Sequence, residues 1–338
     1  MLRRTITTVI LFALAILLII TAWPVFFSLQ RSSGVAQLVA FRGPTILVAI
    51  IVAFLVTLIA LSRRGFDGHA KVFVALLVLF AVANAGILFT RGFGDTTFAA
   101  RGKSDLTVMA WNTLGGKPGA QVISDLAVRS NADIISLPET SKTTADAVAT
   151  LMTAAGHPMT AHSIELNKPF IARSTSVLIS TALGSYTIDT KMGSTRPLPT
   201  VILRPAVPTS PVIVAVHAIA PSSVADTVKW ESDLNWLNGI CTSNNVVMAG
   251  DFNATVDHLL DIGAQAGSVL GNCKDAGLDS KNAAVGSWPT SLPALLGTPI
   301  DHVMYTNNWR VSGMQIVQNL DTAGSDHRPI IVQLAHAA

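Results

Sequence analysis

Polar side chains that can bind a metal ion or transfer a proton follow several short apolar runs after residue 105. Each run has the β-branched and apolar composition of a buried strand. Taken singly, each polar residue could be an Asx turn, a helix cap or a core histidine. Together they favour one shared site, because open α/β sheets collect ligands and catalytic groups at strand ends. These residues are Asn112, Glu139, His217, Asp251, Asn253, Asp301, Asp326 and His327.

The types of these side chains restrict the chemistry of the site. Carboxylates and amide oxygens suit a hard cation, Mg²⁺ or Mn²⁺, better than zinc. Such a cation is usually bound by one or two carboxylates together with phosphate oxygens of a substrate. The sequence has no G-x-x-x-x-G-K-[ST] loop that would bind a nucleotide. The pattern therefore predicts hydrolysis of a phosphate ester or anhydride by an activated water.

Short strand-like runs alternate with helical ones over residues 105–338. Leu106 to Trp111 and Asp133 to Leu137 are predicted strands, and a helical stretch at residues 121–130 lies between them. Mixed strands and helices of this kind predict one α/β domain with a layered sheet core. Residues 91–104 are rich in glycine and polar residues, which predicts a tether before this domain.

Three long apolar runs precede the tether, at about residues 6–27, 44–61 and 72–89. None contains a charged residue, and each is close to the roughly 20 residues that a transmembrane helix needs. Buried core helices, or a cleaved signal peptide in the first run, are the alternatives. Because the three runs follow one another so closely, the sequence favours a multi-pass membrane anchor.

Positive residues set the predicted orientation of this anchor. Five of them lie before the first run or between the second and third runs, which is one side of the membrane. Two lie between the first and second runs, on the other side. The positive-inside rule then places the N-terminus in the cytoplasm and the domain after residue 89 outside it. The five are Arg3, Arg4, Arg63, Arg64 and Lys71, and the two are Arg31 and Arg42.

The basic charge of the chain belongs to its first 90 residues. The whole chain has a net charge of +3, but residues 91–338 contain 16 Lys and Arg against 19 Asp and Glu. A mildly acidic domain without a run of Lys or Arg lacks the electrostatic footprint of a nucleic-acid-binding protein. The expected partners are instead the lipid bilayer and a lipid-phosphate substrate.

The two cysteines, Cys241 and Cys273, are not arranged as a C-x-x-C pair, which excludes a zinc knuckle. Outside the cytoplasm they could form a disulfide. Two free buried thiols are the alternative.

Several motifs in a fixed order resemble those of the endonuclease/exonuclease/phosphatase superfamily, over roughly residues 105–335. They are WN at 111–112, PE at 138–139, His217, GDFN at 250–253, IDHV at 300–303 and SDHRP at 325–329. The resemblance implies a four-layer sandwich of two mixed sheets between helices. The three-span anchor and the sequences GDFNATVDH and GSDHRPI are also similar to the membrane-bound VanJ-type branch. That branch is linked to teicoplanin resistance and to dephosphorylation of undecaprenyl pyrophosphate.

The resemblance implies a metal site and a base. Glu139 would be the principal Mg²⁺ ligand, assisted by Asn112 and by Asp326 on the opposite side of the site. The metal ion would neutralise the phosphate and stabilise the leaving oxygen. Asp251 would orient or deprotonate the attacking water.

The remaining residues would contact the phosphoryl group. Asn253 and His217 would donate hydrogen bonds as negative charge develops in the transition state. His327 would contact the phosphate in its protonated form, oriented by Asp301. His302 follows Asp301 in a strand and points to the other face, so we expect a structural role for it.

Three further residues have open roles. His258 could cap a helix or contact substrate. Arg328 could bind phosphate or form an ion pair that steadies the final loop. Trp288 could line a lipid-facing rim or belong to the core.

The sequence thus predicts a Mg²⁺-dependent phosphohydrolase at the outer face of a membrane, acting on a lipid-linked phosphate or pyrophosphate. A polyprenyl carrier, undecaprenyl or decaprenyl, is the favoured substrate. A phosphodiesterase similar to phospholipase C or sphingomyelinase is the main alternative. An extracytoplasmic nuclease, or a binding module without turnover, is less favoured.

Overall fold

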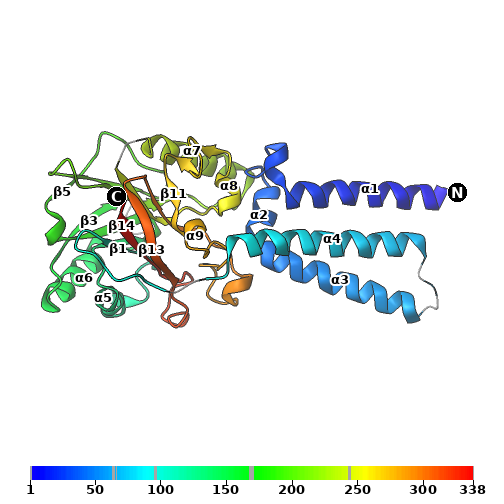
Figure 1. The fold of residues 1–338 in the computed structure, drawn as a ribbon, viewed down its shortest axis with the longest axis horizontal. Helices are drawn as coiled ribbons and strands as arrows, with labels where there is room; N and C mark the ends of the chain where they lie inside the picture. The colour runs from blue at the N-terminus through cyan, green and yellow to red at the C-terminus, as the bar shows by residue number, and fades with distance from the viewer. Residues whose placement is uncertain are drawn as a thin grey trace. The chain divides into compact units, whose positions relative to one another are not determined.

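A computed structural model describes residues 2–62, 65, 67–94, 97–166, 171–242 and 245–337. Arg63 and Arg64, two of the positive residues used to predict the orientation, lie outside the described residues. The chain divides into two compact units, Met1–Thr90 and Arg91–Ala338. Each unit has its own elements (Figure 1) and is described separately.

The predicted apolar helices of the N-terminal part are confirmed. Within the described residues, three helices are long and apolar enough to cross a membrane: α1 (Leu2–Ala22), α3 (Arg42–Ser62) and α4 (Gly68–Arg91). Large apolar side chains along all three are exposed. Their exposure is unfavourable in water but not in the hydrocarbon core of a membrane. α1 ends at Ala22 rather than at Phe27, because Pro24 has no amide hydrogen to continue the helix. Pro24–Phe27 forms the 3-10 helix η1, and α2 (Val35–Ala40) follows.

Two six-stranded mixed sheets form the second unit. In the first, the strand order is β13-β14-β1-β2-β4-β3. The bounds are β13 (Trp309–Ile316), β14 (Ile330–His336), β1 (Leu106–Ala110), β2 (Ile134–Pro138), β4 (Ser174–Ser180) and β3 (Met159–Glu165). In the second, the order is β11-β12-β8-β7-β6-β5. The bounds are β11 (Lys274–Asp275), β12 (Asp301–Tyr305), β8 (Val246–Asp251), β7 (Val212–His217), β6 (Val201–Pro205) and β5 (Tyr186–Ile188).

The inner faces of the two sheets pack against each other. Val108 and Ile134 of the first sheet share a buried cluster with Ala215 and Val247 of the second. The central strands β1, β2 and β8 are buried along their whole length, as expected of strands covered on both faces. Ser136 in β2 also donates a hydrogen bond across the sheets to the carbonyl of Ala249 at 2.7 Å.

Helices cover the outer faces of the sheets (Figure 1). α5 (Gly119–Arg129) and α6 (Lys142–Ala154) bury an apolar stripe, including Ile123 and Met152, against the first sheet. α7 (Val224–Ile240) lies beside the second sheet, where the Trp230 indole donates to the carbonyl of Phe252 at 3.2 Å. The predicted four-layer α/β sandwich is therefore confirmed.

Short elements complete the second unit. They are α8 (Val256–Leu259), α9 (Ala276–Asp279), the two-stranded pair β9 (Ile262–Gly263) and β10 (Leu270–Gly271), and the 3-10 helices η2 (Ile171–Arg173), η3 (Thr181–Leu183) and η4 (Ala294–Leu296). Cys241 at the end of α7 forms a disulfide with Cys273, with a Cα–Cα distance of 5.9 Å. This disulfide links α7 to the chain just before β11.

Candidate active site

Strand register brings three predicted site residues to one level of the second sheet. His217 ends β7 and is aligned with Asp251 at the end of the parallel strand β8. Asp251 is in turn aligned with Asp301, the first residue of the antiparallel strand β12. The predicted strand-end clustering is thus produced by pairing of neighbouring strands.

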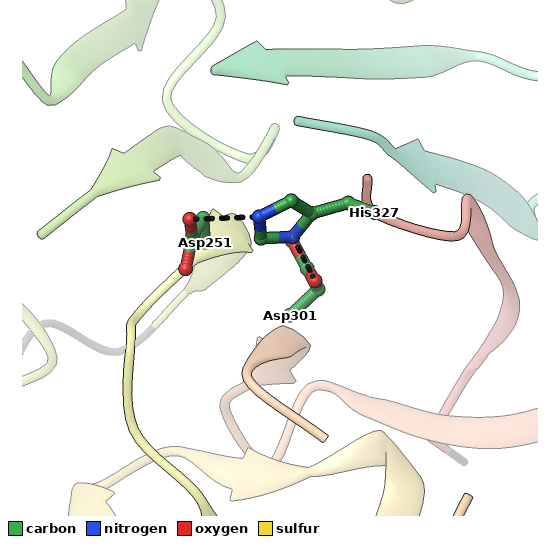
Figure 2. Close-up of side chains that lie close together, drawn as sticks. All are labelled: Asp251, Asp301 and His327. Carbon is green, nitrogen blue, oxygen red and sulfur yellow. Dashed lines mark hydrogen bonds and ion pairs between the residues drawn. The ribbon is translucent and has the colours of Figure 1, made fainter. Parts of the chain in front are cut away.

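His327 lies between the two aspartates of this row (Figure 2). Its Nδ1 is 2.8 Å from Oδ2 of Asp301, and its Nε2 is 3.8 Å from Oδ2 of Asp251. Burial alone would lower the pKa of His327, but the two carboxylates raise it to about 9. The imidazole is therefore positively charged at neutral pH.

Asp251 is held by two hydrogen bonds. Its Oδ1 accepts from the backbone amide of Asn253 at 2.8 Å, and its Oδ2 accepts from the side chain of Asn112 at 3.0 Å. Burial raises the pKa of Asp251, and the charge of His327 opposes that shift. A carboxylate with a raised pKa is a stronger base than an exposed one, which suits proton removal from water near neutral pH.

Asn112 connects Asp251 to Glu139. Its side-chain amide donates to Oε1 of Glu139 at 3.1 Å as well as to Asp251, and its Oδ1 accepts from the amide of Leu114 at 3.0 Å. Burial raises the pKa of Glu139, and the hydrogen bond from Asn112 lowers it. Glu139 has a φ of 55°, a left-handed conformation that is unusual for this residue type. Such local strain is often found at functional sites.

Asp326 has one carboxylate oxygen with a hydrogen-bond partner and one without. Its Oδ2 accepts from the indole of Trp288 at 3.0 Å, whereas its buried Oδ1 has no hydrogen-bond partner among the described residues. The negative charge of Asp326 contributes to the raised pKa of Glu139, after burial. Two carboxylates that repel each other across a site gain stability from a cation placed between them.

His217 lies at the end of strand β7 and Asn253 just after strand β8 of the second sheet, beside the carboxylates described above. Nδ1 of His217 is 3.5 Å from the hydroxyl of Thr175, and its Nε2 is 3.8 Å from Oε1 of Glu139. Burial and the charge of His327 lower the pKa of His217 to about 3, so this imidazole is neutral. Asn253 has a φ of 46° and uses one amide hydrogen on the carbonyl of Ala218 at 2.9 Å. Its second amide hydrogen could serve a substrate.

Two groups of side chains in this arrangement offer donor atoms of the kind that a divalent metal ion binds. Asp251, Asp301 and His327 each offer a ligand atom within 4.8 Å of the others. However, a protonated histidine cannot ligate a metal, and Nδ1 of His327 already bonds Asp301. Glu139 and Asp326, with oxygen atoms and a bare buried Oδ1, are the better match for a hard cation.

Arg328 is structural rather than a phosphate ligand. Its guanidinium makes a two-point contact with Asp321, at 2.9 and 2.6 Å. It also donates to the backbone carbonyls of Gly286, Pro289 and Leu292. These bonds use all five N–H groups of an arginine. Arg328 therefore ties the SDHRP loop to the segment that carries Trp288.

His302 and His258 also have structural partners. His302 lies between Oδ2 of Asp275 and the carbonyl of Ala254, at 2.7 Å on each ring nitrogen. His258 accepts from the amide of Thr255 at 2.8 Å at the start of α8. The structural role expected for His302, and helix capping for His258, agree with these contacts.

Sequence reasoning missed the indole bond from Trp288 to Asp326. It also missed Ser325, whose hydroxyl donates to the carbonyl of Asn112 at 2.6 Å and accepts from the amide of His327 at 3.0 Å. The position of Ser325 in SDHRP was the available signal for it. Nothing in the local sequence connects Trp288 with a residue in that motif.

The sandwich fold and the acid–histidine cluster define a hydrolase of the phosphoesterase class. The family model described as "Endonuclease/Exonuclease/phosphatase family" matches residues 109–327. The chain therefore belongs to this family, whose members are metal-dependent phosphoesterases and hydrolases. A search of curated proteins gave no match.

Solved structures share the fold at low sequence identity. An endonuclease/exonuclease/phosphatase from Beutenbergia cavernae DSM 12333 is 16% identical, with a TM-score of 0.51, and the match covers 69% of this chain and 72% of that chain. D. rerio TDP2 humanized by 14 mutations is 14% identical, with a TM-score of 0.52, and the match covers 69% of this chain and 100% of that chain. At these identities the similarity shows the fold alone.

Proposed function

We propose that this protein is a Mg²⁺-dependent phosphohydrolase that acts on a lipid-linked phosphate or pyrophosphate at the outer face of a membrane. The observation that carries the proposal is the presence of three apolar helices on the same chain as the phosphoesterase unit. A water-soluble substrate would gain nothing from such an anchor. The resemblance to the VanJ-type branch favours a polyprenyl pyrophosphate as the substrate.

Glu139, Asn112 and Asp326 would hold the metal ion. The partnerless Oδ1 of Asp326 and the repulsion between Asp326 and Glu139 support this assignment. When bound, Mg²⁺ would neutralise phosphate charge and stabilise the leaving oxygen. Asn112 orients both Glu139 and Asp251 through its amide hydrogens, so it couples the metal ligands to the base.

Asp251 would take a proton from the attacking water. The bonds from Asn253 and Asn112 fix both carboxylate oxygens, and the raised pKa supplies basicity. Charged His327, oriented by Asp301, would stabilise negative charge on the phosphoryl oxygens. Neutral His217 and the second amide hydrogen of Asn253 would complete these contacts.

The proposed orientation has the N-terminus in the cytoplasm and the catalytic unit outside it. The distribution of positive residues supports this orientation. The Cys241–Cys273 disulfide is compatible with it, because disulfides persist in oxidising compartments. We expect the bilayer and the lipid substrate as partners, and no stable nucleic-acid partner.

The test uses the purified full-length chain with Mg²⁺ and a panel of substrates. The panel contains a polyprenyl pyrophosphate, sphingomyelin, phosphatidylinositol phosphates and DNA. We expect release of inorganic phosphate from the first substrate alone, and loss of that release in Asp251→Ala. Cleavage of DNA, or release of a phosphorylated head group, would replace this proposal with a nuclease or a phosphodiesterase.

A further inference from the structure

The three apolar helices of the N-terminal unit surround a cavity at the end of that unit where the chain begins (Figure 1). Its volume is about 610 Å³, and residues of α1, α3 and α4 contribute to its wall. The polar residues of the wall flank the apolar stretches of α1 and α4, which places them at the level of lipid headgroups in a membrane. They are Arg3, Arg4, Thr7, Asp67 and His69.

Contacts between the helices hold this wall together. The hydroxyl of Thr8 in α1 lies 3.3 Å from Nε2 of His69 at the start of α4. Further along α1, Leu18 packs against a buried cluster of α3 and α4 that is made of Ala49, Ala53, Leu77 and Ala81. Small residues of this kind allow membrane helices to approach closely. The cavity therefore lies in a packed three-helix unit and is not a gap between separate helix ends.

Positive charge in the cavity is not neutralised by the protein. The guanidinium groups of Arg3 and Arg4 have no hydrogen bond or ion pair among the described residues. The carboxylate of Asp67 also belongs to the wall, but its Oδ1 accepts from the amide of Ala70 at 2.7 Å and caps α4. Two unpaired guanidinium groups beside one engaged carboxylate make a site that fits an anion with several oxygen acceptors.

The deeper part of the wall is apolar. Ile10, Leu11 and Phe73 line the cavity. Ile10 and Leu11 lie about 10–12 Å from Arg3 along α1, at the helical rise per residue. The cavity thus has a charged end and an apolar interior. A free phosphate ion would use only the charged end, whereas a phospholipid offers a phosphate to the arginines and an acyl chain to the apolar wall.

We propose that Arg3 and Arg4 bind the phosphate of an anionic phospholipid, whose acyl chain lies along Ile10, Leu11 and Phe73. A guanidinium donates two parallel hydrogen bonds to phosphate oxygens. An anionic headgroup is favoured over a zwitterionic one because it places no positive group beside the arginines. The residues of the proposed active site all belong to the Arg91–Ala338 unit, so this lipid site does not depend on the proposed function.

Native mass spectrometry of the purified full-length protein in detergent tests the site. Equal amounts of a phosphatidylglycerol and a phosphatidylcholine with the same acyl chains are added, and the lipid molecules retained by the protein are counted. We expect the wild type to retain phosphatidylglycerol preferentially. Arg3→Gln/Arg4→Gln should lower that retention by roughly 5-fold for each arginine, the usual contribution of one Lys or Arg beside an anionic headgroup. Detergent micelles have no sidedness, so the membrane orientation of the variant does not affect the result.

Lys71→Gln is the matched control. Lys71 is an exposed residue of α4 and is two positions from both His69 and Phe73, which line the cavity. It therefore lies about 200° around the helix from both of them. The variant removes a positive charge at the same end of the unit but on the other side of α4, so it should retain phosphatidylglycerol as the wild type does.

A second variant tests the apolar part of the cavity. Leu11→Trp fills the interior and keeps both arginines, so it should also lower the retention of phosphatidylglycerol. Inorganic phosphate added to the wild type at millimolar concentration should not displace the lipid, because it makes no contact with the apolar wall.

Several outcomes would overturn the lipid site. Equal retention of the two lipids by the wild type would show that the cavity does not select an anionic headgroup. Equal losses in Lys71→Gln and in the arginine variant would reduce the effect to general surface charge. Displacement of the lipid by inorganic phosphate, or unchanged retention in Leu11→Trp, would show that the cavity holds no acyl chain.

Discussion

Nδ1 of His327 lies 2.8 Å from Oδ2 of Asp301, although the two residues are 26 positions apart in the chain. Asp301 begins β12 of the second sheet, and His327 lies in the loop that leads into β14 of the first sheet. The pair therefore joins the two layers at the active-site edge. It also places a charged imidazole next to Asp251, the proposed base.

Asp301→Asn should lower kcat by about 10²- to 10⁴-fold, the usual contribution of a positioned acid or base. Burial lowers the pKa of His327, and the carboxylates of Asp301 and Asp251 raise it to about 9. Activity that needs the protonated imidazole is therefore present below pH 9 and lost as pH rises through that value. Without the charge of Asp301, this alkaline limb should move to lower pH. The measurement is kcat against pH with saturating Mg²⁺.

The control is Asp189→Asn, which removes an ion pair with Arg204 at 2.5 Å outside the site. It should leave the pH profile unchanged. An alkaline limb that stays in place in Asp301→Asn would argue against His327 as the titrating group.

Trp288→Phe should weaken Mg²⁺ binding by roughly 10- to 100-fold, the usual effect of removing a group that orients a metal ligand. The indole bond holds Oδ2 of Asp326, whose Oδ1 is buried and has no hydrogen-bond partner among the described residues. Titration calorimetry with Mg²⁺ measures the affinity directly. Trp236→Phe is the matched control, because that indole donates to the carbonyl of Met192 in an exposed position. Equal affinities in the two variants would remove Trp288 from the metal site.

Cys241→Ser/Cys273→Ser should lower the free energy of unfolding by about 2–4 kcal/mol. The disulfide closes a loop with a sequence separation of 32 residues and links α7 to the strand region before β11. Denaturant unfolding of the detergent-solubilised chain measures the change. A reductant should destabilise the wild type to the level of the double variant and leave the variant unaffected. Equal stability of both proteins under oxidising conditions would contradict the expected contribution.

His302→Asn should reduce stability more at low pH than at high pH. Both ring nitrogens of His302 face acceptors, Asp275 and the carbonyl of Ala254, so both must donate and the imidazole is charged. Burial opposes this charge, but Asp275 raises the pKa of His302 above its usual value. When the pKa of a histidine is higher in the folded state than in the unfolded state, its charge stabilises the fold. This stabilisation is fully present below the unfolded-state pKa of about 6.5 and is lost as the pH rises through the folded-state pKa.

The difference in unfolding free energy between wild type and His302→Asn should therefore shrink as pH increases from 6 upward. His336→Asn, at an exposed histidine near the C-terminus, controls for general effects of losing an imidazole. A difference that is constant with pH would show that His302 is neutral in the folded protein.

The sequence alone determined the features that depend on local pattern. The length and polarity of the apolar runs predicted α1, α3 and α4, because membrane crossing requires a fixed span of apolar residues. Alternation of strand-like and helical runs, together with the ordered motifs, predicted the sandwich and its family. Polar residues at the ends of apolar strands indicated Asp251, which ends β8, and Asp301, which begins the antiparallel strand β12.

Only the tertiary structure decided contacts between distant segments. The bond from Trp288 to Asp326 spans 38 positions, and the pair of Arg91 with Asp257 spans 166. The five donors of Arg328 reach carbonyls and a carboxylate on separate loops, which no local pattern encodes. Such partners are chosen by how loops pack after the sheets have formed. The glycine-rich composition of residues 91–104 predicts a tether, but only the tertiary structure shows which bonds its described residues make, such as the ion pair of Arg101 with Asp133.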